Sequence, residues 1–334
     1  MFFMNSQKMT FFKFVIFFTF FSINLSIIAA MDSTIIYIHS MPESFQSKMI
    51  KFGMLVAGMK KYVEKTIERN NYNHKPADIP KSLKKKAEIS ETILLDNKVF
   101  TLIPKVNSSN KVILYLHGGA YIEGISKIHW DLIEELMQKT NATIVVADYP
   151  LTPNATYSDV YAFIDEVYSQ LLSEYSNDNI IIMGDSAGGG LALGFVQKLR
   201  NEGSVLPNQL ILISPWLDIT MSNPEIQEID KKDKMLNVRG LKLAAELYAD
   251  NLEHDNYLVS PNYGTFQGLP KISVFTGTYD ILNPDANKLK EIVSATDTKL
   301  NFFEYPKMFH VWVLITSLKE SQSAINQIVK LILE

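Results

Sequence analysis

A serine at the centre of the pentapeptide Gly184-Asp185-Ser186-Ala187-Gly188 is the first candidate for covalent chemistry in this chain. The apolar run Asn179–Met183 precedes it like a buried strand, and the residues that follow, to about Asn201, have the pattern of a helix. Strand, tight turn and helix form the context in which a G-x-S-x-G motif presents its serine as a nucleophile. So short a motif recurs by chance, so a base, an acid and an oxyanion site must be found elsewhere in the chain.

A glycine-rich turn, HGGAY at residues 117–121, follows the apolar run Val112–Leu116. Acyl transfer needs N–H donors aimed at the oxygen that becomes negatively charged, and a glycine-rich turn frees backbone N–H groups for that task. The candidate donors are the N–H groups of Gly118, Gly119 and Ala120, together with that of Ala187 after the serine. A tight strand-to-helix turn without a ligand is the alternative interpretation.

An acid and a base follow the last two strand-like runs. Asp280 comes after Ile272–Thr276, and His310 comes after Leu300–Tyr305. Histidine can take the proton of a serine, and a carboxylate can orient the imidazole and stabilise its charged form. The order Ser186, Asp280, His310 is one of the chain orders in which such triads occur.

Each of these residues also has an ordinary structural interpretation. Asp280 could cap a helix, which would leave Asp285 as the nearest alternative acid. A lone histidine among apolar residues usually belongs to the core. The other histidines are His39 and His74 near the N-terminus, His117 in the glycine-rich turn, and His129 and His254 near helix starts. Only His310 has the place in the chain that a base must occupy.

The remaining chain alternates strand-like and helix-like segments, which predicts a largely parallel sheet covered on both faces by helices. The predicted strands are Val112–Leu116, Thr143–Tyr149, Asn179–Met183, Gln209–Ser214, Ile272–Thr276 and Leu300–Tyr305. The predicted helices are Trp130–Lys139, Tyr157–Ser173, Ala187–Asn201, Asp285–Ala295 and Ser317–Leu333. Before them, Ile93–Leu95 and Val99–Leu102 predict a hairpin around Asp96-Asn97.

Two regions depart from this alternation. Residues 41–86 carry apolar residues at helical spacing, which predicts one or two amphipathic helices that end near Pro76 and Pro80. The interval from Leu217 to Pro270 is too long for a simple crossover and holds a further helix near Leu241–Asp250. An insertion there would lie over the carboxyl ends of the strands, where ligands bind in open α/β sheets.

Composition limits the class of protein. A chain of 334 residues suits one large α/β domain or two smaller ones, and its 47% apolar content can fill a substantial core. The net charge of -4 gives no indication of a nucleic-acid partner, and basic runs such as Lys84–Lys86 fit a solvated face. The absence of cysteine excludes disulfides, thiolate metal sites, cysteine nucleophiles and lipoprotein lipidation.

Residues 1–31 have the pattern of a targeting segment. They contain two lysines, Lys8 and Lys13, no acidic residue, and an almost wholly apolar run from Phe14 to Ala30. This pattern predicts a signal peptide or a membrane anchor, and the leading lysines favour an external catalytic domain. We expect export or membrane association through residues 1–30, with a cytoplasmic enzyme as the alternative.

Taken together, the motifs resemble the hormone-sensitive-lipase-like (type IV) esterase and lipase group of the α/β-hydrolase fold. The matching segments are HGGAY (117–121), DYPLTP (148–153), GDSAGG (184–189), SPWLD (214–218), the Asp280 turn and MFHVW (308–312). The resemblance extends from about residue 85 to the C-terminus. It implies hydrolysis of small carboxylic esters without a cofactor, by an α/β-hydrolase domain in residues 32–334. It also implies a helical cap, built from residues of about 41–80 and the interval 217–270.

Two segments depart from the family pattern. The third glycine of the family's His-Gly-Gly-Gly is Ala120 here, but only a backbone donor is needed at that position. The family's Tyr-Arg-Leu-Ala-Pro-Glu reads YPLTPN at residues 149–154, which puts a local ion pair in doubt and leaves the triad untouched.

The sequence therefore predicts a serine carboxylesterase in which Ser186 attacks, His310 acts as base and Asp280 orients it. A small-molecule ester is the expected partner, with no nucleic acid and no metal. Bulky apolar residues are expected to close a pocket for short or medium acyl chains; they are Met41, Phe45, Met49, Phe52, Met54, Leu55, Leu241, Leu243 and Leu247. The alternatives are an amidase, formamidase or peptidase with the same triad, and a catalytically silent binding protein on the same fold.

Overall fold

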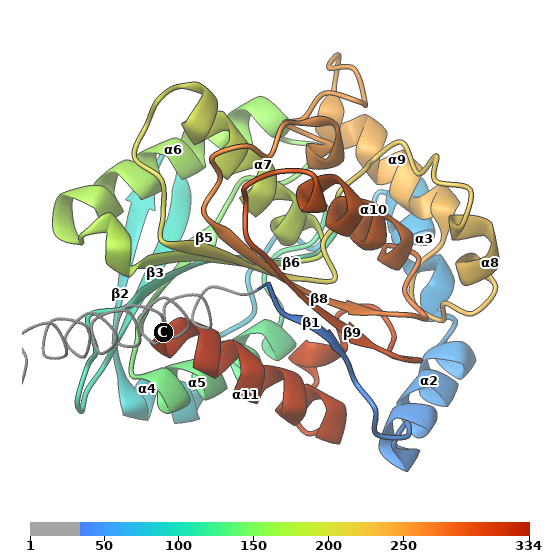
Figure 1. Ribbon diagram of the computed structural model, residues 1–334, viewed down its shortest axis with the longest axis horizontal. Helices are drawn as coiled ribbons and strands as arrows, with labels where there is room; N and C mark the ends of the chain where they lie inside the picture. The colour runs from blue at the N-terminus through green and yellow to red at the C-terminus, as the bar shows by residue number, and fades with distance from the viewer. Residues whose placement is uncertain (1–33) are drawn as a thin grey trace, which may run out of the picture. The chain divides into compact units, whose positions relative to one another are not determined.

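A nine-stranded sheet runs through residues 34–334, which are the residues that the computed structural model describes (Figure 1). Its order is β1-β9-β8-β7-β6-β4-β5-β3-β2, and all neighbours are parallel except the antiparallel pairs β2–β3 and β3–β5. The strands are β1 (Ile36–Ile38), β2 (Ala87–Leu94), β3 (Asn97–Pro104), β4 (Val112–Leu116), β5 (Thr143–Asp148), β6 (Ile180–Asp185), β7 (Gln209–Ile213), β8 (Lys271–Gly277) and β9 (Leu300–Tyr305).

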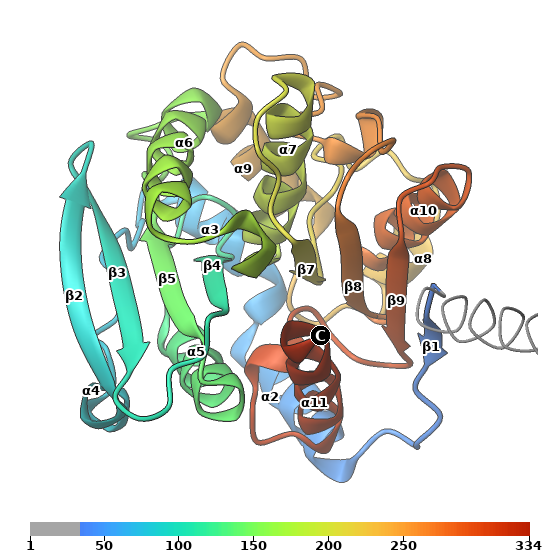
Figure 2. The same ribbon diagram turned by 60° about the vertical axis from the view of Figure 1, so that its left-hand side comes forward.

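Helices cover both faces of the sheet because the central strands are apolar on both sides. In β4, Val112, Leu114 and Leu116 join the core on one face, while Ile113 and Tyr115 join the core on the other. Figure 2 shows one helical layer with α6 (Tyr157–Glu174), α7 (Ala187–Asn201) and α10 (Asn283–Ser294). The opposite layer holds α4 (Lys81–Lys86), α5 (Lys127–Thr140) and α11 (Lys319–Leu333). The predicted doubly covered, mostly parallel sheet is confirmed.

The six predicted parallel strands lie within two residues of their observed bounds, and the predicted hairpin is β2–β3 with longer strands. Strand β1, which was not predicted from the sequence, has only three residues and pairs with β9 at the sheet edge. The prediction that the N-terminal helices end near Pro76 and Pro80 was wrong. The second of them ends at Glu68, and Asn70 then adopts a left-handed φ of 50° that stops the helix.

Helices from two distant parts of the chain pack together beside the sheet. The first part contains α2 (Phe45–Ala57), a short 3-10 turn η1 (Met59–Lys61) and α3 (Tyr62–Glu68). The second lies between β7 and β8 and contains α8 (Ile226–Asp230) and α9 (Val238–Ala249). Arg239 on α9 joins them through ion pairs with Glu64 at 3.3 Å and Glu68 at 2.7 Å.

The predicted signal or anchor segment, residues 1–31, lies outside the described residues. Within residues 34–334, none of the helices combines the length and apolar character required to cross a bilayer.

Candidate active site

Ser186 occupies a strained turn between β6 and α7. Its φ of 52° and ψ of -121° lie outside the regions that side-chain-bearing residues prefer, a kind of strain that is concentrated at functional sites. Hydrogen bonds hold the turn from both sides, because Ser186 N–H donates to Ile213 at 2.9 Å and Trp216 N–H donates to Ser186 O at 2.9 Å. A side chain at Gly188 would place its Cβ 2.1 Å from Leu116 O, so this position requires glycine.

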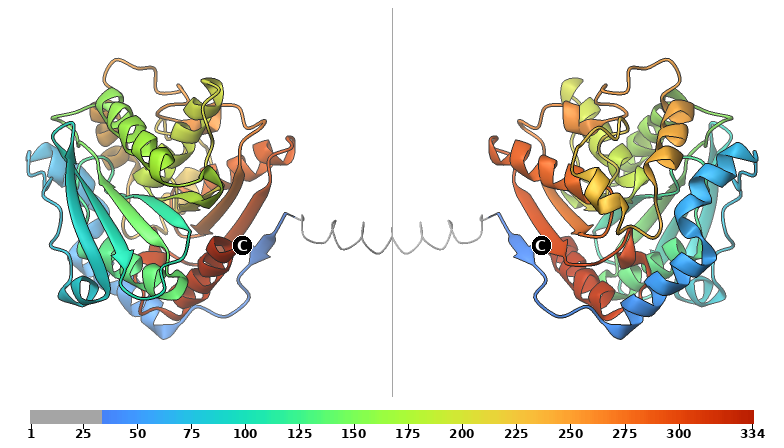
Figure 3. Two further views of the ribbon diagram at one scale, coloured as in Figure 1. Left: turned by 90° about the vertical axis from the view of Figure 1, so that its left-hand side faces the viewer. Right: turned by 90° about the vertical axis from the view of Figure 1, so that its right-hand side faces the viewer.

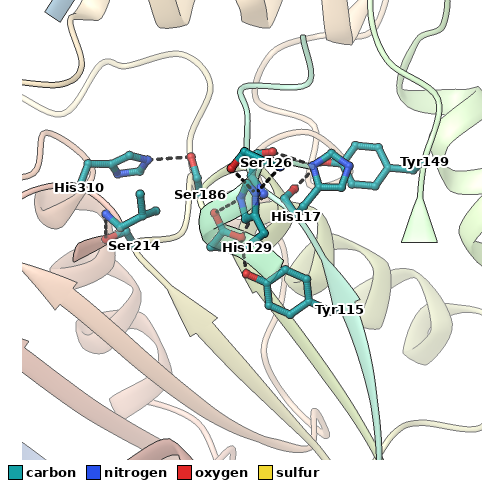
Figure 4. Close-up of polar contacts among 11 residues, drawn as sticks. Tyr115, His117, Ser126, His129, Tyr149, Ser186, Ser214 and His310 are labelled. Atoms are coloured by element: carbon teal, nitrogen blue, oxygen red, sulfur yellow. Dashed lines mark hydrogen bonds and ion pairs between the residues drawn. The ribbon is translucent and has the colours of Figure 1, made fainter. Parts of the chain in front are cut away.

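The structure brings Ser186, His310 and Asp280 into one hydrogen-bonded row. His310 Nε2 lies 2.9 Å from Ser186 Oγ, and His310 Nδ1 lies 2.9 Å from Asp280 Oδ2 (Figure 4 shows the serine and the histidine). A carboxylate only accepts hydrogen bonds, so Nδ1 carries the proton and Nε2 is left facing the serine hydroxyl. Burial lowers the pKa of His310, but the nearby Asp280 carboxylate outweighs burial and raises the pKa above its usual 6.5.

Backbone contacts join the two loops that carry the acid and the base. Tyr279 N–H donates to Met308 O at 2.9 Å, and Lys307 N–H donates to Thr278 Oγ1 at 2.8 Å. On the far side of the histidine, Val311 N–H donates to Ser214 Oγ at 3.1 Å, at the end of β7. These bonds carry the loop after β9 back toward the centre of the sheet, where Ser186 lies.

Asp280 combines the two interpretations that its sequence position allowed. Its Oδ2 faces His310, while its Oδ1 accepts the N–H of Leu282 at 2.9 Å and so holds the turn before α10. The alternative acid, Asp285, lies elsewhere and accepts a hydrogen bond from Asn223 at 3.0 Å, with burial raising its pKa to about 6. Within residues 34–334, the carboxylate bonded to His310 is that of Asp280.

The glycine-rich turn after β4 lies beside Ser186. Gly119 has a φ of 123° and Ala120 a φ of 52°, which turn the backbone sharply. The N–H of Gly118 is already used, because it donates to Asp185 Oδ1 at 3.1 Å. The N–H groups of Gly119, Ala120 and Ala187 have no hydrogen-bond acceptor among the described residues. Of the four candidate donors, these three are the ones available to a ligand.

Asp185 was not recognised from the sequence as a functional residue, yet it anchors this turn. Its buried carboxylate accepts hydrogen bonds from Tyr115 at 2.7 Å and from Gly118, and it lies 3.4 Å from His129 Nε2 (Figure 4 labels Tyr115 and His129). Ser126 N–H donates to His129 Nδ1 at 2.9 Å, so Nε2 carries the proton that points to Asp185. Burial opposes ionisation, but these partners outweigh it and lower the pKa of Asp185. The signal in the sequence that could have identified Asp185 is a charged residue at the end of an otherwise apolar, buried strand.

His117 plays a structural part in the same turn. Its Nδ1 lies 2.7 Å from Gly118 O, and its ring stacks on Tyr149 with centroids 4.4 Å apart. Burial lowers its pKa to about 4, so the imidazole is neutral at pH 7. His117 therefore supports the backbone of the turn that lies beside Ser186.

A second residue missed from the sequence is Asp233, in the interval between β7 and β8. Its Oδ2 accepts the N–H of Ile281 at 2.9 Å, next to Asp280, and its Oδ1 accepts the N–H groups of Met235 and Leu236 at 2.7 and 2.9 Å. Burial and then the charge of Asp280 raise its pKa to about 6. Asp233 thus connects the turn that holds Asp280 to the interval between β7 and β8. It lies among lysines in the sequence, so no local motif distinguishes it.

A cavity of about 360 Å³ opens above Ser186 and His310. Its walls are mainly apolar and come from both packed helical regions and the loop after β4; they include Met59, Val63, Ile125, Met235, Leu236 and Leu241. Near its edge, Tyr62 donates to Glu123 at 3.2 Å. The expectation that the apolar residues of 41–55 line this pocket was wrong: of the residues proposed to close it, only Leu241 does so.

We also searched the described residues for side chains that could bind a metal ion together. Residues 34–334 contain no group of three or more histidine or acidic side chains arranged to hold an ion.

Comparisons with known proteins agree with this geometry. A family pattern described as the alpha/beta hydrolase fold matches residues 113–314. An esterase from Acinetobacter venetianus is 32% identical over 61% of this chain and 70% of its own, and an acetyl-hydrolase from Streptomyces hygroscopicus is 30% identical over 60% and 68%.

Solved structures give the same result. A Staphylococcus aureus protein provisionally called an esterase is 34% identical, with a TM-score of 0.75 over 81% of this chain and 90% of that one. An esterase of the bacterial hormone-sensitive lipase family shares the fold, with a TM-score of 0.74 at 23% identity over 88% and 99% of the two chains.

The chain belongs to the α/β-hydrolase fold family. Its similarity to proteins named esterase and acetyl-hydrolase confirms the α/β-hydrolase resemblance found in the motifs and assigns the chain to the carboxylester hydrolases.

Proposed function

We propose that this protein is a serine carboxylesterase for esters of short and medium acyl chains, with Ser186, His310 and Asp280 as its catalytic triad. The observation that carries the proposal is the row of two 2.9 Å contacts from Ser186 Oγ through the imidazole to Asp280. The free N–H groups beside the serine supply the second requirement, a place for the oxyanion.

In the first half of the reaction, Ser186 Oγ attacks the ester carbonyl carbon while His310 Nε2 takes its proton. The carbonyl electron pair moves onto oxygen, which the N–H groups of Gly119, Ala120 and Ala187 stabilise. When this tetrahedral intermediate collapses, the bond to the alcohol breaks and His310 returns the proton to the leaving oxygen. An acyl-serine and a free alcohol result.

Water completes the cycle by the same route. His310 takes a proton from water as its oxygen attacks the acyl carbon, and the proton then goes to Ser186 Oγ as the acid leaves. Through both halves Asp280 keeps the proton on Nδ1 and stabilises the imidazolium by its charge.

Cavity size supports the limit on the acyl chain. Ligand pockets span roughly 300–1,000 Å³, so a cavity of about 360 Å³ lies at the small end of this range. Its mainly apolar walls favour an ester whose acyl group fits inside.

A chain-length series tests the proposal. We expect kcat/KM on p-nitrophenyl esters to peak between acetyl and octanoyl, and Ser186→Ala to abolish turnover. A maximum at palmitoyl would contradict the size limit, and faster cleavage of matched anilides would indicate an amidase. Failure of a fluorophosphonate probe to label Ser186 would contradict the catalytic assignment itself.

For location, we propose export or membrane retention through residues 1–31, with the catalytic domain outside the cytoplasm. The support is the sequence pattern alone: two early lysines followed by the apolar run Phe14–Ala30. Cell fractionation with N-terminal sequencing of the active material tests it. An intact Met1 in the soluble cytoplasmic fraction would refute it.

A further inference from the structure

The first helix of the described chain, α2, turns a row of large apolar side chains to solvent. We call Phe45, Met49, Phe52, Leu55 and Val56 the α2 apolar face. Phe45, Phe52 and Val56 are 75%, 60% and 72% exposed, and successive members are spaced for one side of a helix. Figure 1 and the right-hand view of Figure 3 place the blue helix α2 at the rim of the molecule, with no other element over its outer side. A contiguous apolar surface of this kind marks an interaction site.

The inner side of the same helix accounts for its folding, so the outer side is not needed for the core. Ile50 and Met54 pack on the core of one sheet face, and Ser47 is fully buried with its hydroxyl 3.8 Å from Met308 Sδ. Ser44 caps the helix by accepting the N–H of Ser47 at 3.1 Å. An amphipathic surface helix normally shows polar residues outward, and α2 reverses this rule.

The charges around the face are those that suit an anionic lipid surface. From Ser44 to Val63 the sequence holds four lysines and no acidic residue: Lys48, Lys51, Lys60 and Lys61. Lys48 projects from the middle of the α2 apolar face, three residues after Phe45 and four before Phe52. Lys51 is paired with Glu43 at 2.7 Å and Lys60 with Asp230 at 3.2 Å, whereas Lys48 on α2 and Lys61 on η1 have no ion pair within residues 34–334. Bulky apolar residues with an unpaired lysine on the same side of a helix are features of interfacial helices.

The chain outside the described residues favours the same partner. Only residues 31–44 separate the apolar run Phe14–Ala30 from the start of α2 in the sequence. A chain that reaches a bilayer through that run has α2 tethered close to the lipid. We propose that the α2 apolar face docks on the surface of an anionic lipid bilayer.

Docking there has a consequence for the candidate active site. The inner side of α2 contacts the loop that carries His310, since Lys51 Nζ donates to Lys307 O at 3.1 Å. The chain then continues into η1 and α3, whose Met59, Tyr62 and Val63 line the cavity above Ser186. The docked helix would therefore place the cavity wall at the lipid surface. This consequence rests on the proposed function, whereas docking itself does not.

Local lipid contact can be measured directly because the chain has no native cysteine. Phe52→Cys in the full-length protein gives one site for an environment-sensitive fluorophore, and Ser173→Cys, exposed on α6, gives the matched control. Vesicles of phosphatidylcholine and phosphatidylglycerol, with a nitroxide on the acyl chains, should shift the emission at position 52 to the blue and quench it several-fold. The label at position 173 should not respond. The readout reports on α2 whether or not residues 1–31 insert, and it requires no turnover.

Two further variants test the chemistry of the surface. In the labelled protein, Phe45→Gln with Val56→Gln should lower the quenching, because half of the remaining apolar face is removed. Lys48→Glu should weaken contact with phosphatidylglycerol vesicles by roughly fivefold, and much less with pure phosphatidylcholine. Hydrolysis of a soluble acetyl ester should be unchanged in each, since none of these residues lines the cavity.

Three results would overturn the proposal. Equal quenching at positions 52 and 173, or none at either, would exclude docking through α2. Blue-shifted emission before vesicles are added, without quenching afterwards, would indicate that protein covers the face. Dependence of that signal on protein concentration would then identify a second copy of the chain, and independence would identify the N-terminal segment.

Discussion

Ser186 and the glycine-rich turn follow β6 and β4, which are neighbours in the middle of the sheet. Asp280 and His310 follow β8 and β9, two and three strands away from β6. The first pair, the nucleophile side, is fixed by backbone geometry, close glycine packing and the buried carboxylate of Asp185. The second pair, the acid–base side, is fixed by hydrogen bonds between loops and by Asp233 from the insertion.

The two sides should therefore be sensitive to substitutions at different kinds of position. The nucleophile side depends on positions that lie within a few residues of Ser186 or across one strand pair. The acid–base side depends on contacts between loops, because Asp233 in the insertion reaches the turn of Asp280 by accepting the N–H of Ile281. Among the described residues, the two sides are joined by the hydrogen bond between Ser186 Oγ and His310 Nε2.

Breaking the contact between Ser186 and His310 should have the largest effect. Ser186→Ala and His310→Ala should each lower kcat by at least about 10⁴-fold, and the double variant should lose little more, because the residues act as a unit. Steady-state kinetics with circular dichroism as a folding control would measure this. If the losses in kcat were additive, Ser186 and His310 would act independently, which contradicts the triad. A tenth of normal activity in Ser186→Ala would also contradict it.

Asp280→Asn tests the acid–base side alone. The amide can donate to Nδ1, which favours the tautomer whose Nε2–H cannot accept the serine proton, so kcat should fall on the order of 10³–10⁴-fold. Asparagine can still accept the N–H of Leu282, so the turn should persist. Near-normal kinetics in this variant would reduce Asp280 to a turn residue and move the acid role elsewhere.

Asp185→Asn tests the nucleophile side in the same way. The amide cannot accept from Tyr115, Gly118 and His129 together, so the turn that carries the free N–H groups should loosen. Loss of one oxyanion donor costs roughly 10²–10³-fold in kcat, and we expect a loss near 10²-fold with KM little changed. Tyr115→Phe, which removes one of the three partners, should have a smaller effect in the same direction. An unchanged kcat in Asp185→Asn would show that the turn holds without the carboxylate.

The same contrast explains which parts of the fold and the site could be predicted from the sequence. Apolar strands bounded by turns located β4 to β9, and Ser186, Asp280 and His310 could be named because each directly follows such a strand. Asp233 could not be found, because a carboxylate among lysines in an insertion has no local signature. The outward direction of Phe45 and Phe52 was also hidden: helical spacing identifies an apolar face, but only packing shows which way that face points.

The smallest expected effect comes from Asp233→Asn, which separates a positioning role from a merely structural one. An amide at this position keeps one acceptor but loses the negative charge beside Asp280, so kcat at high pH should fall by only about tenfold. The informative readout is the pH profile. Protonated His310 cannot act as a base, and its pKa is raised by the carboxylates of Asp280 and then Asp233. In the unmodified protein, kcat/KM should therefore fall as the pH drops through a value above 6.5. Without the charge of Asp233 the pKa of His310 should decrease, and this fall should move to lower pH. A loss of activity with an unchanged pH profile would mean that Asp233 holds the loop in place but does not affect the pKa of His310. The charge that raises this pKa would then come from Asp280 and not from Asp233.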